Sequence, residues 1–465
     1  MVPDDGSGSG QKMVREYPEA FEAHEVGAAI AATRFGYGAR PQELLQIGDQ
    51  PREWLLGQLI SDPVPEALKS LPDSKDLLSD MLAARQKGRS SMRVYRQEAR
   101  KRALTEAATH LAVSLNSPTP FVERLVRFWT NHFTVSMVKP AVMPLVTAFE
   151  REAIRPNIFN SFYTMLHAVV SHPAMLIYLD NVNSLGPNSV AGRGRKNPLN
   201  DRLARQLLEH FTLGEGSGYT QLDVRALAHM LTGWTVGVNN PATRGEFAFR
   251  DSWHEGNFKE FLRRTIPSAG VLEGEAALDH LARSAATGKN LSHKMAQAFV
   301  VDDPDPGLAS EIFAGFVVGG GRADGMARGL VEASEAWAPE QRKVKSPTDL
   351  VLSVLRSLDV RSRSGRRVLN AVRFLGQPPY QAPTPDGWPY SSLSWITPEL
   401  LLERVEWCAE IAGITRPPDG KPVPDLALDI LGPLLKPATH RRLRVARDEV
   451  EALALLYASP EFQRR

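Results

Sequence analysis

Apolar residues recur at spacings of three and four along most of the chain, which is the pattern of helices with one buried face. The spacing predicts helices over residues 20–35, 119–135, 140–155, 200–213, 221–232, 348–358, 398–412 and 447–457. Apolar and polar residues almost never alternate between turn residues, and Glu246–Arg250 is the only segment predicted as a strand. We therefore predict a mainly α fold, a single large multi-helix bundle with long Pro- and Gly-rich loops and little or no β structure.

Residues with known preferences for helix ends support these boundaries. Thr220 and Asp223 are spaced as a near capping box, and Gly233 follows the same helix as a stop signal. First-turn prolines are predicted at Pro41, Pro51, Pro347 and Pro398. The irregular segments are 183–199, 236–270, 376–396 and 414–425. Within them, Gly376–Pro389 is too rich in proline for a helix or a central strand, and we expect it to lie extended across the helical body.

The first residues differ in composition from the rest of the chain. Alternating Gly and Ser before Met13 indicate that residues 1–12 are a disordered tail or a cloning remnant. No secretory signal is visible after Met13, so the compartment is left open. No fixed repeat and no clear linker interrupts the remainder, which predicts one helical domain over residues 13–465.

The composition is that of an ordinary globular protein. The chain has 465 residues, of which 43% are hydrophobic and 23% charged, and a net charge of +2. This near-neutral balance argues against nucleic-acid binding as a property of the whole chain. Because Cys408 is the only cysteine, an intramolecular disulfide, a tetrathiolate zinc site and an iron–sulfur cluster held by the chain's own thiolates are excluded. No apolar run approaches the roughly 18 residues of a membrane-spanning helix.

A row of basic residues is the clearest predicted surface feature. Five arginines recur every three or four residues and share one helix face: Arg85, Arg89, Arg93, Arg96 and Arg100. Such a face could meet an acidic partner, an anionic lipid or a nucleic acid, and the competing interpretation is a solvated helix face. The arginines within 361–367 leave the same alternatives open.

The densest group of aromatic and polar residues lies at Arg127–Phe133. Trp129, Asn131 and His132 would suit the wall of a pocket, but they would equally suit a buried helix end with a hydrogen-bonded histidine. The chain has 11 histidines and no H-x-x-x-H pair, so the helical two-histidine zinc signature is missing. Histidines distant in sequence could still converge in space.

Several segments together resemble the uncharacterised family DUF 1800 (domain of unknown function 1800). They are Ala32–Gly38, Glu123–Phe133, His172–Asn181, Asn197–Trp234, Phe299–Pro304, Gly376–Pro389 and Ala458–Arg464. The resemblance runs from about residue 25 to the C-terminus. It implies no established reaction. It does imply possible export and a possible partner, since many members look exported and are encoded beside a sulfatase-like partner family.

The chain departs from the family's pattern in its central helix. Gln206 replaces a glutamate, and Phe211 stands where relatives have a histidine. His210 is one residue away, about 100° around an α-helix, so it cannot simply substitute. Relatives also often carry histidine at three further positions, which are here Ser284, Asn290 and Ala298. If relatives use that helix for catalysis or metal binding, this chain has lost part of the apparatus. The competing interpretation is that these residues only join helices by hydrogen bonds.

Two main hypotheses follow. The preferred one is a binding or accessory protein with a weakened or absent catalytic site, which meets a protein or another acidic macromolecule through Arg89, Arg93 and Arg96. The other candidate binding residues are Trp129, Asn131, His172, Asn200 and Arg205. The alternative is a hydrolase, with or without a metal, that uses His132, Glu209 and His254 in a pocket completed by Asn131 and His172. Haem or another cofactor in the helical body is a third possibility. The sequence identifies no cofactor, metal or compartment.

Overall fold

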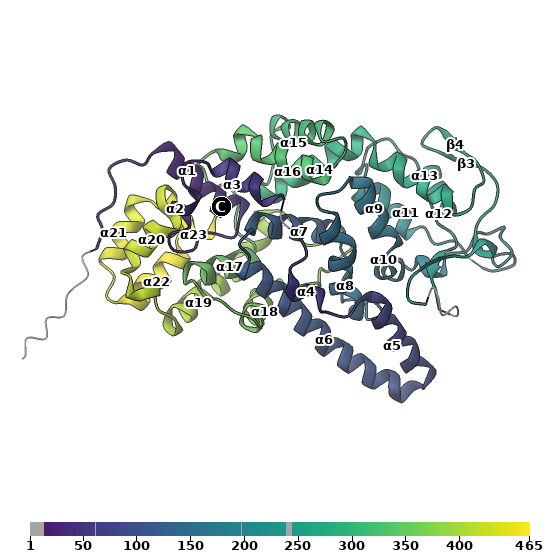
Figure 1. The fold of residues 1–465 in the computed structure, drawn as a ribbon, viewed down its shortest axis with the longest axis horizontal. Helices are drawn as coiled ribbons and strands as arrows, with labels where there is room; N and C mark the ends of the chain where they lie inside the picture. The colour runs from purple at the N-terminus through teal and green to yellow at the C-terminus, as the bar shows by residue number, and fades with distance from the viewer. Residues whose placement is uncertain (1–13, 61, 197, 239–243) are drawn as a thin grey trace, which may run out of the picture. The chain divides into compact units, whose positions relative to one another are not determined.

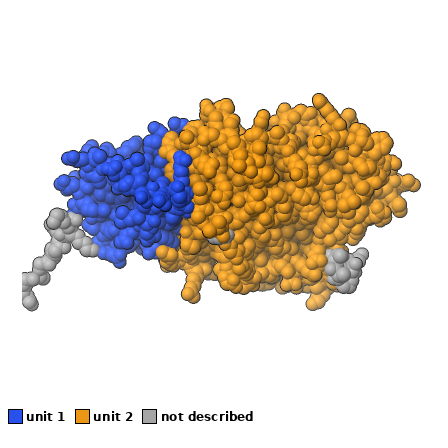
Figure 2. Space-filling view, turned by 45° about the horizontal axis from the view of Figure 1, so that its top comes forward, with its two compact units in different colours: residues 1–54, 339–360, 395–465 blue, residues 55–338, 361–394 orange. Residues whose placement is uncertain are grey.

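The computed structural model describes residues 14–60, 62–196, 198–238 and 244–465. The described chain is mainly α-helical, which confirms the predicted fold class (Figure 1). It divides into two compact units, which Figure 2 distinguishes by colour. Unit 1 comprises residues 1–54, 339–360 and 395–465, and unit 2 comprises residues 55–338 and 361–394. The prediction of one domain over 13–465 stays a prediction, and the predicted tail at 1–12 lies outside the described residues.

Unit 1 is built from the two ends of the chain and one internal segment. Its elements, with short 3-10 and π helices labelled η, are α1 (Ala23–Ile30), η1 (Ala31–Phe35), α2 (Glu43–Ile47), α17 (Pro347–Ser357), α19 (Pro398–Ile414), η10 (Pro418–Gly420), α20 (Val423–Leu431), η11 (Gly432–Leu434), α21 (Pro437–Arg444), α22 (Glu449–Ala458) and α23 (Pro460–Gln463). The chain passes from one unit to the other at four points, and two of these lie within elements: α3 (Pro51–Gln58) and η9 (Ser392–Trp395).

Unit 2 contains the remaining elements. Its α-helices are α4 (Glu66–Lys69), α5 (Ser74–Gln86), α6 (Arg89–Asn116), α7 (Pro120–His132), α8 (Val146–Phe149), α9 (Phe162–Ser171), α10 (Pro173–Tyr178), α11 (Arg202–Gln206), α12 (Gln221–Met230), α13 (Val271–Ala282), α14 (Ala285–Phe299), α15 (Pro306–Val318), α16 (Ala323–Glu332) and α18 (Arg366–Phe374). Its short helices are η2 (Met143–Leu145), η3 (Glu150–Ile154), η4 (Arg155–Asn157), η5 (Asn181–Asn183), η6 (Leu207–Phe211), η7 (Asp251–Trp253) and η8 (Ser334–Trp337).

Most of the helix boundaries predicted from capping residues and first-turn prolines are correct. The Thr220 side chain accepts a hydrogen bond from the Asp223 amide, and Asp223 accepts one in return, so the predicted capping box is complete. Pro51, Pro347 and Pro398 are each the first residue of a helix, as predicted. The prediction for Pro41 was wrong, because α2 begins two residues later at Glu43. The predicted helix over 140–155 is divided into η2, α8 and η3.

The β structure consists of two small antiparallel pairs. The predicted strand at 246–250 is confirmed as β2 (Phe247–Phe249), which pairs with β1 (Trp234–Val236) so that Thr235 lies opposite Ala248. The prediction that it would be the only strand was wrong, because β3 (Lys259–Phe261) and β4 (Arg264–Ile266) form a second pair. Strands of three residues are too short to show a period of two in the sequence.

In unit 1, the segment Ala32–Gly38 packs against α17. The Ser353 hydroxyl donates to the Tyr37 carbonyl at 2.9 Å, and Arg356 Nε donates to the Gly38 carbonyl at 2.8 Å. The buried Arg356 guanidinium also pairs with Glu43 at 2.7 Å. This segment of the resemblance therefore joins the N-terminal helices of unit 1 to α17.

In unit 2, aromatic side chains fill much of the core around α7. Trp129 and Phe133 are buried, and Phe211 from η6 packs edge-on against Phe133 at 5.1 Å between ring centroids. Helices α15 and α16 approach closely where both lack side chains, since a Cβ on Gly315 would lie 2.5 Å from the Gly325 carbonyl oxygen. Among the described residues, no helix combines the length and the apolar character needed to cross a membrane.

Candidate functional site

The predicted central helix contains a π-helical turn. The chain is α-helical over α11 and then continues as η6, which holds Glu209, His210 and Phe211. A π turn adds a residue relative to an α turn and therefore changes which side chains share a face. The angle of about 100° between His210 and position 211 assumed an α-helix, and a π turn makes it somewhat smaller. That His210 cannot simply replace a histidine at position 211 stays a prediction.

Three side chains from neighbouring helices bind the carbonyl groups at the end of η6. Lys294 of α14 donates to the His210 carbonyl at 2.8 Å, and His132 of α7 donates to the Phe211 carbonyl at 3.2 Å. Asn290, also of α14, donates to the Thr212 carbonyl at 2.7 Å. The last carbonyls of a helix have no partner within the helix, so these three side chains supply the missing donors. We call Lys294, His132 and Asn290 the cap donors.

His132 is held as a neutral imidazole. Because a carbonyl oxygen only accepts, the Nε2 atom carries the proton and Nδ1 carries the lone pair. Nδ1 is buried and has no hydrogen-bond partner among the described residues. Burial, together with the positive charge of Lys294, keeps the pKa of His132 well below its usual value. The ring stacks on His210 at 5.5 Å between centroids.

Lys294 and His210 form a second pair of perturbed groups. The Lys294 Nζ atom lies 3.3 Å from His210 Nδ1, and Asp386 Oδ1 lies 3.6 Å from that same nitrogen. Burial lowers the pKa of Lys294 to about 8. Burial and the Lys294 charge lower the pKa of His210 to about 4, so this imidazole is neutral at pH 7. Groups with such shifts cluster at functional sites, although structural networks also produce them.

The segment 376–391, which we call the strap, contains turns at 379–380 and 385–386 and is therefore not extended throughout as predicted. It places Asp386 beside His210. Asn131 donates from Nδ2 to the Trp388 carbonyl at 2.9 Å and accepts from the Trp388 amide at 2.7 Å. Gly387, between Asp386 and Trp388, has φ +87°, and a Cβ there would lie 2.5 Å from the Asn131 carbonyl oxygen. The strap is therefore fixed to the end of α7, next to His132.

The other predicted residues of the central helix lie in surface ion pairs and loop contacts. Arg205 pairs with Glu209 at 3.0 Å and with Asp201 at 3.0 Å, all with partly exposed side chains. Asn200 donates to the Leu179 carbonyl at 2.9 Å. The Glu209 carboxylate therefore pairs with the Arg205 guanidinium and not with one of the predicted site histidines.

His172 and His254 each contact a glutamate that the sequence did not single out. His172 caps α10 by accepting from the Ala174 amide at Nδ1, and its Nε2 donates to Glu152 at 3.1 Å. His254 lies 3.0 Å from the Thr232 carbonyl and 3.2 Å from Glu273, whose side chain is fully buried. Both imidazoles are oriented by fixed oxygen acceptors.

The predicted pocket residues thus have separate partners. His132 packs beside Trp129, and Glu209 pairs with Arg205, whereas His172 and His254 are held by Glu152 and Glu273. In the part of the chain that the structure describes, no three His, Cys, Asp or Glu side chains are grouped so that they could hold a metal ion. A shared pocket of these residues stays a prediction.

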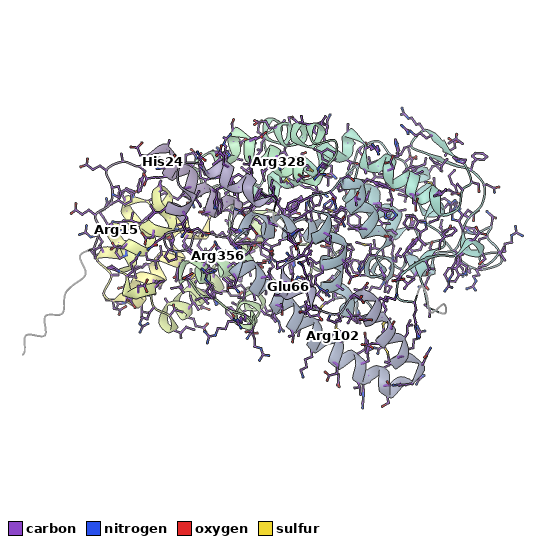
Figure 3. All side chains as sticks on the ribbon, in the orientation of Figure 1. Arg15, His24, Glu66, Arg102, Arg328 and Arg356 are labelled. Atoms are coloured by element: carbon purple, nitrogen blue, oxygen red, sulfur yellow. The ribbon has the colours of Figure 1, made fainter. Side chains whose placement is uncertain are left out.

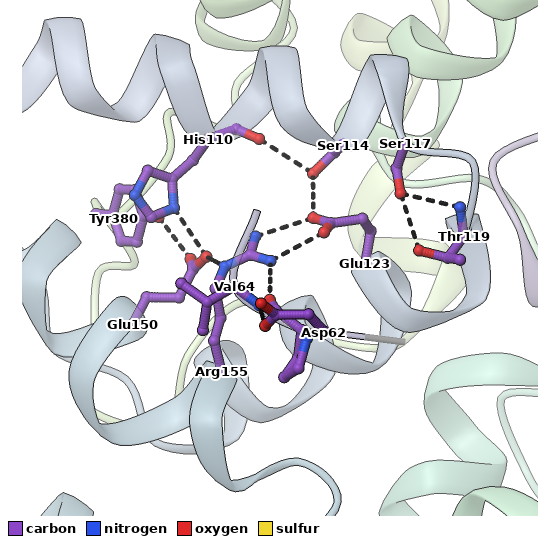
Figure 4. Close-up of polar contacts among 11 residues, drawn as sticks. Asp62, Val64, His110, Ser114, Ser117, Thr119, Glu123, Glu150, Arg155 and Tyr380 are labelled. Atoms are coloured by element: carbon purple, nitrogen blue, oxygen red, sulfur yellow. Dashed lines mark hydrogen bonds and ion pairs between the residues drawn. The ribbon is translucent and has the colours of Figure 1, made fainter. Parts of the chain in front are cut away.

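A buried ion network in unit 2 was not predicted at all (Figure 4). Arg155 binds both oxygens of Glu123 at 2.9 Å, and its Nε donates to Glu150 at 2.8 Å. His110 donates from Nδ1 to Glu150 at 2.8 Å, and the Tyr380 hydroxyl of the strap donates to the same carboxylate at 2.5 Å. These charges and donors outweigh burial and lower the pKa of Glu150.

Two members of this network, Glu123 and Tyr380, lie in segments of the resemblance, but only Glu123 also stands out by its local sequence. Glu123 stands within a segment of the resemblance and between apolar neighbours that face the core, which is an unusual place for a carboxylate. The other members come from α6, η3, η4 and the strap, and nothing in their local sequences marks them as partners. Through Tyr380, the network joins the strap to the helices of unit 2. It has no exposed group, and we interpret it as structural.

The five predicted arginines are exposed. The prediction that they share one helix face was wrong for Arg85, which lies in α5, whereas the other four lie in α6 beyond the break at Gly88. Helices α5 and α6 form a hairpin that extends beyond the other helices of unit 2 in Figure 1. Figure 3 labels Arg102 midway along α6, and the basic residues precede it. Seven of them are exposed and have no ion pair within the described residues, and we call them the basic arm: Arg85, Lys87, Arg89, Arg93, Arg96, Arg100 and Lys101. Glu98 is the only acidic residue between the first and the last of them.

The comparisons with known proteins add one match. A family model described as "Protein of unknown function (DUF1800)" matches residues 30–464. Neither the comparison with curated proteins nor that with solved structures gives a match.

Proposed function

Because the chain belongs to the DUF1800 family, whose members are described only as proteins of unknown function, we propose a function from its own surfaces: it is a binding protein that holds an acidic macromolecule on its basic arm. The observation that carries this proposal is the arm itself, a row of exposed arginines and lysines without ion pairs among the described residues.

Repulsion among the cations of the basic arm destabilises the protein unless an acidic partner is bound. Like charges one helical turn apart, such as Arg89 with Arg93 and Arg96 with Arg100, repel each other by about 0.2–0.5 kcal/mol per pair. An ordinary solvated helix face intersperses acids and bases, as Arg205 does with Asp201 and Glu209. An acidic partner would remove this repulsion and would gain from the release of counterions.

The state of the predicted catalytic residues supports binding over catalysis. His132 is used as a cap donor, and its neutral ring is buried at 1% exposure. Asn131 fixes the strap, and Glu209 is neutralised by Arg205. Each of these side chains therefore has a structural task that accounts for its position.

Charge reversal on the arm tests the proposal. The probes are poly-L-glutamate and heparin on a sensor surface, at 50 mM salt. We expect Arg89→Glu/Arg93→Glu/Arg96→Glu to weaken binding of both polyanions by about tenfold or more. The matched control is Arg441→Glu/Arg442→Glu/Arg444→Glu, which changes the net charge equally on the exposed side of α21 in unit 1. Equal losses in the two variants would show that only the net charge matters, and would overturn the proposal.

A hydrolase is the second candidate function, and one observation favours it. The His254 imidazole lies 3.2 Å from the fully buried Glu273 carboxylate, and a carboxylate is the group that orients catalytic and metal-binding imidazoles in many enzymes. Metal analysis of the purified, tag-free protein tests the metal-dependent form. Stoichiometric metal that is lost in both His254→Ala and His132→Ala would support it, whereas metal retained in both variants would count against this pocket.

A further inference from the structure

Helix α18 presents a second group of unpaired arginines. Its buried side chains are Val368, Leu369 and Val372, which leaves the opposite side free. The exposed residues on that side are Arg366, Arg367, Asn370, Arg373 and Phe374. These arginines, and Arg363 just before the helix, have no ion pair within the described residues. Phe374 is 53% exposed, an unusual position for an aromatic side chain.

This second group lies against the same helix that carries the basic arm. Gly365, with φ +58°, touches α6 so closely that a Cβ would lie 1.8 Å from the Ala108 carbonyl oxygen. Asn116 of α6 donates to the Ser362 carbonyl at 2.7 Å. Ala108 follows Lys101 by seven residues, so α18 begins on the face of α6 where Lys101 lies. The cations of α18 therefore lie next to the C-terminal half of α6, whereas the arm residues from Arg89 to Lys101 lie along its N-terminal half. This helix has 28 residues and is about 42 Å long.

We propose that the basic arm and the exposed side of α18 together bind a single-stranded nucleic acid. This inference rests on the proposed function and names the class of its partner. The cations are almost all arginine, whose planar guanidinium matches phosphate oxygens. Phe374, beside Arg373, provides a flat apolar surface on which an unpaired base can stack.

The composition of the surface disfavours a folded protein as the partner. Protein interfaces are organised around a core depleted in charge and rich in apolar and aromatic residues. Here Val94 and Phe374 are the only large hydrophobic side chains with high exposure on α6 and α18. Binding to such a surface depends on counterion release, which a strand of phosphates supplies. The net charge of +2 argues against nucleic-acid binding only by the chain as a whole, because these cations are concentrated on one helix pair.

Fluorescence anisotropy with a labelled 30-nucleotide oligothymidylate tests the inference on the full chain. Neutralising three arginines, as Arg89→Gln/Arg93→Gln/Arg96→Gln, should reduce the slope of log K against log salt by about 2, because a single strand releases about 0.7 counterions per phosphate. Phe374→Ala should weaken binding of the single strand about fivefold or more and leave binding of a duplex of equal length unchanged, because paired bases cannot stack on it.

The controls separate this inference from the proposed function. Arg441→Gln/Arg442→Gln/Arg444→Gln should leave the salt slope unchanged. If the arm binds poly-L-glutamate or phosphatidylglycerol vesicles but not the oligonucleotide, the proposed function stands and the nucleic-acid inference is overturned. It is also overturned if Phe374→Ala weakens single-strand and duplex binding equally. If the arm variants bind every polyanion as the wild type does, both proposals fail.

Discussion

The Nε2 atom of His132 donates a hydrogen bond to the backbone carbonyl of Phe211 at 3.2 Å. His132 is the last residue of α7, and Phe211 is the last residue of η6. The two residues therefore meet through a backbone contact that does not depend on the side chain at position 211.

The first prediction concerns the stability that His132 provides. Replacing it by alanine removes a buried ring and leaves the Phe211 carbonyl without a donor, so we expect His132→Ala to lower the free energy of unfolding by about 2–4 kcal/mol. His132→Gln, which can still donate, should cost less. Urea unfolding followed by tryptophan fluorescence measures both variants. An unchanged midpoint in His132→Ala would show that the cap is unimportant.

The second prediction is a pH dependence that comes from Lys294. Burial lowers its pKa from 10.5 to about 8. Between these two pH values the unfolded chain holds a proton that the folded chain has lost, so this group makes the folded state more stable as the pH rises. Relative to Lys294→Met, the wild type should gain up to about 3 kcal/mol from pH 8 to pH 10.5.

Unfolding in urea at several pH values measures this difference. Lys289→Met is the matched control, because Lys289 is an exposed lysine on the same helix, α14. A pH dependence that is the same in the two variants would contradict the assignment to Lys294.

The sequence predicted those features that depend on neighbours in the chain. The Thr220 and Asp223 capping box and the prolines at positions 51, 347 and 398 needed only local information, and they were confirmed. The helical period also predicted the fold class, since one buried face per helix is enough to produce it.

Features that depend on distant partners were not predictable in this way. His210 lies in a π turn, which has no signature in the apolar spacing. Arg155 finds Glu123 and His110 finds Glu150 only because the tertiary fold brings their helices together. The role of His132 could not be decided either, because a cap donor and a catalytic imidazole look the same in a sequence.

The third prediction concerns the buried ion network. Arg155 is 1% exposed and neutralises two buried carboxylates, Glu123 and Glu150. Removing the guanidinium leaves these charges without compensation, so Arg155→Met should lower the free energy of unfolding by about 3–5 kcal/mol. Arg283→Met, which breaks an exposed pair with Asp279, should change it by less than about 0.5 kcal/mol. Similar costs in the two variants would show that the network contributes no more than a surface pair.

The fourth prediction concerns the attachment of the strap, and its argument starts from Gly387. This residue adopts φ +87°, and a side chain there would collide with the Asn131 carbonyl oxygen at the end of α7. Gly387→Ala should therefore detach the strap locally while the helices of unit 2 stay folded. The Trp388 amide, which donates to Asn131 at 2.7 Å, reports on this state by hydrogen exchange.

We expect the Trp388 amide to exchange at least about tenfold faster in Gly387→Ala, since local strain of this kind costs about 1–3 kcal/mol. Asn131→Ala should have the same effect, because it removes both hydrogen bonds to Trp388 without strain. Gly413→Ala is the control, since a Cβ at that position in α19 meets nothing within 4 Å. If both strap variants kept full protection of the Trp388 amide, Asp386 would have to be held beside His210 by other contacts, such as its hydrogen bond from Gln206.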